Sequence, residues 1–243
     1  MLIINADDWG RSVAETDAAL ACYKEGRVTS VSAMVFMEDS ERAAHLAREN
    51  AIDVGLHLNL TEKFTAGTCP PQIQHSHARI ARFLRKAKYS QLLYNPFLAQ
   101  GISESYKAQV AEFERLYGKQ PSHIDGHHHM HLCGNVIWSS AIPAGTKMRR
   151  NFSFWPGEKS WLNRAYRAVV DQRLARKYRL PDYFFCLSQS LQQKKLGRVE
   201  ALARFKKVEL MTHPIVPMEL DFLMGPEFQA MLQRVKIGGY SAV

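Results

Sequence analysis

Short apolar segments rich in β-branched residues alternate with longer segments of mixed polarity along most of this 243-residue chain. The clearest apolar segments fall at residues 2–6, 27–36, 53–59, 121–125, 183–186 and 208–211, and a weaker one covers residues 147–150. Such alternation predicts strands joined by helices, and therefore a mainly parallel sheet in an α/β fold. An open doubly wound sheet and a closed or partly closed barrel both satisfy this pattern.

Local signals define some of the connections between the predicted elements. Ser12, with Glu15 three residues later, fits a capping box and predicts that a helix begins after it. Residues 61–77 contain two prolines and a glycine without periodicity, which predicts a long loop of the kind that often carries function. No internal repeat or linker is evident, so we expect one domain over residues 1–243.

Composition and charge exclude several classes of protein. The formal net charge of +9 favours an anionic partner such as a phosphorylated sugar, an acidic glycan or nucleic acid. The basic residues are scattered and no nucleic-acid-binding motif is present, so we expect no nucleic-acid partner.

No run of about 18 apolar residues exists, which predicts no membrane span. The four cysteines lie far apart and the N-terminus lacks signal-peptide features, so we expect a cytoplasmic protein without disulfides.

Polar side chains with catalytic or metal-binding potential follow the ends of four predicted strands. Asp7 and Asp8 come after the first strand, and His57 lies near the end of the third. His127 and His213 each follow a later strand. Because the carboxyl ends of parallel strands meet on one face, these distant residues can share one site.

One carboxylate and two imidazoles form a three-ligand set that leaves a coordination position open. Catalytic zinc sites have this composition, and other divalent ions accept the same ligands. A bound metal polarises a carbonyl and lowers the pKa of water, while amide hydrolysis also requires a base and an acid. Adjacent carboxylates need not point the same way, so one of Asp7 and Asp8 could bind metal while the other acts as base. The alternative is that this pair forms an ordinary turn or helix cap.

Histidine is concentrated in residues 123–131, which hold five of the ten in the chain. Such tracts suggest metal binding. In an extended strand His123, Asp125 and His127 share one face, so Asp125 could orient an imidazole. The alternative is that most of these histidines are packing or surface residues. The chain has no nucleophile elbow and no Walker A loop, so serine catalysis and P-loop chemistry have no support.

Five motifs, in this order, resemble those of the YdjC-like carbohydrate deacetylases, which include the chitooligosaccharide deacetylases. They are NADDWG at residues 5–10, GRVTS at 26–30, GLHLNLT at 55–61, HIDGHHHMH at 123–131 and ELMTHP at 209–214. Together they span most of the chain, and as a set they are far more specific than any single motif.

The resemblance implies a distorted (β/α) barrel, in a single domain related to the polysaccharide deacetylases. It also implies one divalent metal ion, Mg²⁺ or Zn²⁺, held by Asp8, His57 and His127. By analogy with the wider deacetylases, Asp7 would be the general base and His213 the general acid. The substrate would be a small saccharide that contains N-acetylglucosamine, with or without a phosphate group. Dimers are common among relatives, so a homodimer is expected.

We therefore predict a hydrolase that removes the N-acetyl group of such a saccharide and releases acetate. Trp9, in the same motif as the Asp pair, would either stack on a sugar face or belong to the core, and Asp125 is a second candidate for substrate contact. Two other functions stay open. A metal-dependent phosphoesterase could use the same ligands, although such sites often hold two metals. A non-catalytic metal-binding or glycan-binding protein could use them as well.

Overall fold

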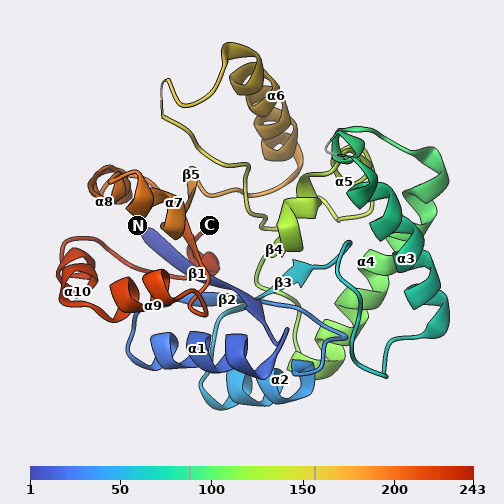
Figure 1. The fold of residues 1–243 in the computed structure, drawn as a ribbon, viewed down its shortest axis with the longest axis horizontal. Coiled ribbons are helices and arrows are strands. Elements are labelled where there is room, and N and C mark those ends of the chain that lie inside the picture. The colour runs from blue at the N-terminus through green and yellow to red at the C-terminus, as the bar shows by residue number, and fades with distance from the viewer. Residues whose placement is uncertain (88, 156) are drawn as a thin grey trace.

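A sheet of six parallel strands forms the centre of the molecule (Figure 1). The computed structural model describes residues 1–87, 89–155 and 157–243. The strand order is β4-β3-β2-β1-β6-β5. The strands are β1 (Leu2–Trp9), β2 (Ser30–Ala33), β3 (Val54–Leu58), β4 (Ile124–Gly126), β5 (Tyr183–Cys186) and β6 (Val208–Thr212). All six of the clearest apolar segments are therefore strands, as predicted.

Helices surround the sheet, and α6 stands away from it at the edge of the view in Figure 1. Within the described residues, no helix combines the length and apolarity that crossing a bilayer requires. The α-helices are α1 (Val13–Lys24), α2 (Ser40–Glu49), α3 (Pro71–Lys86), α4 (Pro96–Tyr117), α5 (Gly134–Ile137), α6 (Trp161–Lys177), α7 (Leu187–Gln192), α8 (Leu196–Ala203), α9 (Pro217–Met224) and α10 (Pro226–Leu232). Short 3₁₀ helices are η1 (Ser90–Leu92), η2 (His127–Leu132) and η3 (Tyr240–Ala242).

The sheet curls into a partly closed barrel, because side chains far apart in the strand order meet across its interior. The Tyr240 ring stacks on His123, just before β4, with ring centroids 3.6 Å apart. The hydroxyl of Tyr240 also donates to Glu209 of β6 at 2.5 Å. Strands β3, β2 and β1 separate β4 from β6 in the sheet, so one ring can touch both only if the sheet bends. The structure thus confirms the distorted barrel.

Residues 147–150 do not form the expected strand. Only isolated bridges are present there, between Lys147 and Arg179 and between Met148 and Ile124. These bridges join the segment to β4 on one side and to the residues before β5 on the other. The segment therefore lies at the gap between the two edge strands, where it cannot build a full ladder with either.

Two connections can be compared with the helix start and the loop that the sequence predicts. The capping box is present, since the Ser12 hydroxyl accepts from the backbone N–H of Glu15 at the start of α1. The predicted loop over residues 61–77 is wrong in its second half, because α3 already begins at Pro71. Proline suits the first position of a helix, where its fixed φ is favourable and its missing N–H has no partner to lose.

Gly55 provides a test of the barrel interior. A Cβ at this position in β3 would collide with the imidazole of His123. Replacing Gly55 by Ala should therefore lower the free energy of unfolding by about 1–3 kcal/mol, the usual cost of overpacking. Urea denaturation followed by circular dichroism measures this change.

The matched control is Gly197→Ala in α8, where an added Cβ meets nothing. Alanine should leave stability unchanged there or raise it by up to about 1 kcal/mol. Equal effects of the two substitutions would contradict the packing of His123 beneath β3.

Candidate metal centre

An irregularity near the end of β1 brings two neighbouring carboxylates to the same place. From Ala6 to Trp9 the strand advances three residues while its partner β2 advances two, from Val31 to Ala33. Asp8 lies in this irregularity with a left-handed φ of 64°, a region that aspartate enters more readily than most residues. Consecutive side chains of a regular strand point to opposite faces. The extra residue therefore explains how Asp7 and Asp8 can both approach the same imidazole.

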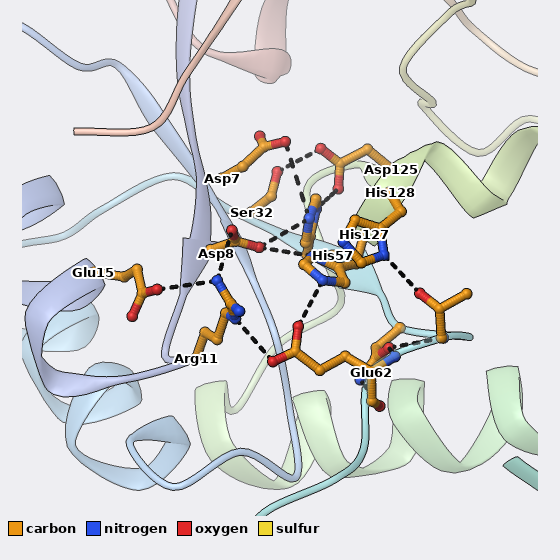
Figure 2. A network of polar contacts seen from close by, with 12 residues as sticks. Asp7, Asp8, Arg11, Glu15, Ser32, His57, Glu62, Asp125, His127 and His128 are labelled. Carbon is orange, nitrogen blue, oxygen red and sulfur yellow. Dashed lines mark hydrogen bonds and ion pairs between the residues drawn. The ribbon is translucent and has the colours of Figure 1, made fainter. Parts of the chain in front are cut away.

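Asp8, His57 and His127 meet at the carboxyl ends of β1, β3 and β4 (Figure 2). The Oδ1 atom of Asp8 lies 3.4 Å from Nε2 of His57 and 2.9 Å from Nδ1 of His127. One ligand atom from each of the three residues lies within 4.8 Å of the other two. All three side chains are buried. The structure thus brings together the three residues expected to hold a metal.

A second carboxylate contacts the far side of each imidazole. Nδ1 of His57 lies 2.8 Å from Asp125, whose other oxygen accepts a hydrogen bond from Ser32 at 2.8 Å. Nε2 of His127 lies 2.7 Å from Glu62, in the loop after β3. Carboxylates commonly hold metal-binding histidines in this way and leave the opposite nitrogen for the cation. Sequence reasoning missed Glu62, although it directly follows the GLHLNLT motif.

The charges of this cluster favour a cation. Burial alone would lower the pKa of His57, but Asp125 and Asp7 raise it to about 10. Burial would raise the pKa of Asp8, but its hydrogen bonds to the two histidines hold that pKa far below its usual value. The cluster therefore attracts positive charge, which protons or a metal can supply. A carboxylate with two imidazoles suits Zn²⁺ and other divalent ions, so these residues fit a metal.

Asp7 is held by a buried arginine that sequence reasoning also missed. Arg149 donates from Nη1 and Nη2 to the two oxygens of Asp7, at 2.7 and 2.6 Å. The same guanidinium lies 2.7 Å from Asp125 and donates to Glu209 at 2.7 Å. Burial would raise the pKa of Asp7, but the charge of Arg149 outweighs it and holds that pKa below its usual range. Asp7 is therefore an ionised carboxylate with a fixed orientation.

His213 comes directly after β6, at the same edge of the sheet. Its neighbour Thr212 pairs with Ala6 of β1, so His213 lies alongside the start of the Asp pair in the strand register. The side chain is half-buried, and the backbone N–H donates to Glu219 at 2.5 Å. Its part in the site stays a prediction.

Trp9 and Asp125, the two further candidates for substrate contact, are both fully buried. Trp9 is fully buried and its indole N–H donates to the backbone of Ala43, so no face of the ring is open to a sugar. It belongs to the core. Asp125 is also fully buried, and His57, Ser32 and Arg149 engage its two oxygens. Whether it contacts substrate stays a prediction.

The remaining histidines of residues 123–131 lie outside the cluster of three. His128 and His129 both have left-handed backbones, with φ of 52° and 59°, within η2. They line a cavity of about 250 Å³ together with Tyr166 and Arg167. One histidine of the tract thus joins the candidate metal ligands, and two neighbours face an adjoining cavity.

Arg149 generates a prediction about stability. Removing its charge by Arg149→Gln would leave three buried carboxylates without their cation, which should cost about 3–5 kcal/mol of unfolding free energy. Guanidinium denaturation of both proteins measures the difference. Arg204→Gln is the control, because that exposed arginine pairs with Glu200 on the surface and should contribute at most about 1 kcal/mol. A loss no greater than that of the control would show that Arg149 does not balance the interior charge.

The chain is similar in sequence to proteins named as chitooligosaccharide and carbohydrate deacetylases. A "chitooligosaccharide deacetylase" of Serratia marcescens is 34% identical over 54% of this chain and 51% of its own length. "Carbohydrate deacetylases" of Mus musculus and Homo sapiens are each 31% identical, over 70% and 89% of this chain and 56% and 75% of their own lengths. The match thus spans only about half the length of the first two relatives.

A solved structure from Enterococcus faecalis, provisionally described as a cellobiose-phosphate cleavage protein, has the same fold. Its TM-score is 0.71 at 20% identity, over 99% of this chain and 97% of that one. The model of the YdjC-like protein family matches residues 1–234. The chain therefore belongs to the YdjC-like family.

Proposed function

We propose that this protein is a metal-dependent hydrolase that removes the N-acetyl group of a small saccharide containing N-acetylglucosamine. The observation that carries the proposal is the meeting of Asp8, His57 and His127, with a carboxylate behind each imidazole. The names of the relatives, carbohydrate and chitooligosaccharide deacetylases, support the substrate class.

One divalent ion, Mg²⁺ or Zn²⁺, would be held by Asp8, His57 and His127. When bound, such an ion polarises an amide carbonyl and lowers the pKa of a water molecule. Asp125 would keep the ring of His57 in place, and Glu62 would do the same for His127. Both carboxylates strengthen the imidazole as a ligand.

Asp7 and His213 would move the protons of the reaction. As water attacks the acetyl carbon, a C–O bond forms and Asp7 accepts a proton from that water. When the amide C–N bond breaks, His213 gives a proton to the departing amine, so the products are acetate and the free amino sugar. Arg149 would keep Asp7 ionised and aligned for the first step.

The cavity beside His128 and His129 would receive the sugar. Its volume of about 250 Å³ lies below the range of about 300–1,000 Å³ that is typical of pockets for larger ligands. Asn151 and Arg167 on its wall offer polar groups to sugar hydroxyls, and Tyr166 offers an exposed aromatic ring. A single ring with its acetamido group is the ligand that these features suit.

Arg149 also bears on the phosphoesterase alternative. A second set of possible ligands exists in Asp7, His57 and Asp125, as a two-metal site would require. However, Nη2 of Arg149 lies 2.6 Å from Asp7 and 2.7 Å from Asp125. A second cation would meet this fixed positive charge, which favours one metal and a deacetylase.

Removal of the metal tests the proposal. Dialysis against a chelator should abolish acetate release from N,N′-diacetylchitobiose, and about one equivalent of Zn²⁺ or Mg²⁺ should restore it. His57→Ala and His127→Ala should lose both the bound metal and the activity, whereas the exposed His45→Ala should lose neither. Elemental analysis and an acetate assay provide the two measurements.

Other outcomes identify the competing functions. Two metals per chain with release of phosphate from phosphate esters would establish a phosphoesterase. Tight metal binding without hydrolysis of any N-acetyl sugar would establish a binding protein.

The different roles proposed for Asp7 and Asp8 give a separate prediction. Asp7→Asn should retain the metal while kcat falls by about 10²–10⁴, the usual contribution of a general base. Asp8→Asn should instead lose metal affinity. Metal content and kcat of both variants decide the assignment, and loss of metal in Asp7→Asn alone would mean that the roles are reversed.

A further inference from the structure

The side chain of Tyr240, in η3, is fully buried inside the barrel. Its ring is stacked on His123 with an angle of 5° between the two planes. Its hydroxyl donates to Oε2 of Glu209 at 2.5 Å. The backbone is held as well, because the N–H of Tyr240 donates to Asp53 and its carbonyl accepts from Lys147. Ring, hydroxyl and backbone therefore fix this tyrosine in one position.

Glu209 of β6 lies between this hydroxyl and the buried guanidinium of Arg149. Its Oε1 atom accepts from Nε of Arg149 at 2.7 Å, while Oε2 accepts from Tyr240. Each oxygen of the carboxylate thus has a donor, which is the arrangement that suits the ionised form of a buried carboxyl group. Loss of the hydroxyl would take from Oε2 the donor that Tyr240 supplies.

The contact with Glu209 engages the one nitrogen of Arg149 that does not reach Asp7. Nη1 and Nη2 donate to the two oxygens of Asp7 at 2.7 and 2.6 Å, and Nη2 also lies 2.7 Å from Asp125. The ring of Phe184 covers the guanidinium, with its centroid 4.8 Å from Cζ. A guanidinium is planar and rigid, so a contact at Nε restricts the orientation of the whole group. Glu209 therefore helps to decide how the two Nη groups meet Asp7.

Glu209 titrates close to neutral pH. Burial raises the pKa of its carboxyl group to about 7; the charge of Arg149 and the hydroxyl of Tyr240 oppose this rise, and the charge of Asp125 adds to it. Above this pH the ionised carboxylate forms strong hydrogen bonds with both donors. Below it the protonated group is neutral and holds Arg149 less firmly. The orientation of Arg149 should therefore loosen as the pH falls through the pKa of Glu209.

We propose that Tyr240 and Glu209 are positioning residues, which act through Arg149 to hold Asp7 in place for proton transfer. The role of Asp7 as the base rests on the proposed function. Neither positioning residue lines the cavity beside His128, so their effect should appear in kcat rather than in KM. The family model matches residues 1–234, so Tyr240 lies outside the part of the chain that shows the family.

The experiment compares Tyr240→Phe and Glu209→Gln with the wild type. Phenylalanine keeps the ring against His123 and removes only the hydroxyl, while glutamine keeps the shape of Glu209 and removes its charge. Near neutral pH, kcat for acetate release from N,N′-diacetylchitobiose should fall about tenfold in each variant, as the loss of one hydrogen bond to a charged group would give, with KM unchanged. The control is Tyr89→Phe, which removes the hydroxyl of an exposed tyrosine and should change neither value.

The pH dependence of kcat separates positioning from a purely structural role. In the wild type, kcat should rise as Glu209 ionises at a pH of about 7. Tyr240→Phe removes a donor that favours the ionised carboxylate, so the pKa of Glu209 rises and this rise in kcat should move to higher pH. Glu209→Gln has no group that titrates there and should lose it. A pH profile that keeps its position in both variants would overturn the proposal.

The Nε–H group of Arg149 gives a measurement that needs no turnover. Its NMR resonance should titrate at a pH of about 7 in the wild type, at higher pH in Tyr240→Phe, and in Glu209→Gln it should not titrate in this range. If no saccharide releases acetate, these changes would still support control of Arg149 by Tyr240 and Glu209, and the proposed function alone would have failed. A resonance that titrates alike in all three proteins refutes the inference.

Discussion

A single buried guanidinium holds the interior of this barrel together. Arg149 contacts Asp7 of β1, Asp125 of β4 and Glu209 of β6, three carboxylates that arise on separate strands. Unpaired charges of this kind are costly in a protein interior, and only a cation with several directed donors can satisfy them together. The curl of the sheet brings the three strands within reach of one side chain. Fold and site therefore depend on the same interaction.

In the candidate metal centre, the two imidazoles are supported on the side that faces away from Asp8. Asp125 pairs with His57, and the Glu62 carboxylate lies 2.7 Å from His127, in each case at the nitrogen that faces away from Asp8. Ser32 in turn fixes Asp125, and it accepts a hydrogen bond from Asn5 at 2.7 Å. Such support keeps ligands in place before a cation arrives, which reduces the entropy lost on binding. The polar residues of β1 and β2 that surround this network are buried because they support these side chains.

The ends of the strands are the part of this architecture that can be predicted most directly from the sequence. Asp8, His57 and His127 could be placed together because each lies at or just after the end of an apolar segment, and parallel strands present those ends on one face. Arg149 could not be found in this way, since its partners become neighbours only when the sheet curls. For Trp9 the sequence left open whether the ring stacks on a sugar or belongs to the core, and the structure buries it in the core.

Position 8 has two requirements that no residue type other than aspartate meets at once. Its backbone has a positive φ, which asparagine and glycine also tolerate, while its carboxylate faces two imidazoles. Asparagine would preserve the conformation and abolish the charge, whereas glutamate would preserve the charge and strain the chain. A single nucleotide change, from an aspartate to an asparagine codon, would thus remove the charge of this centre without disturbing the architecture.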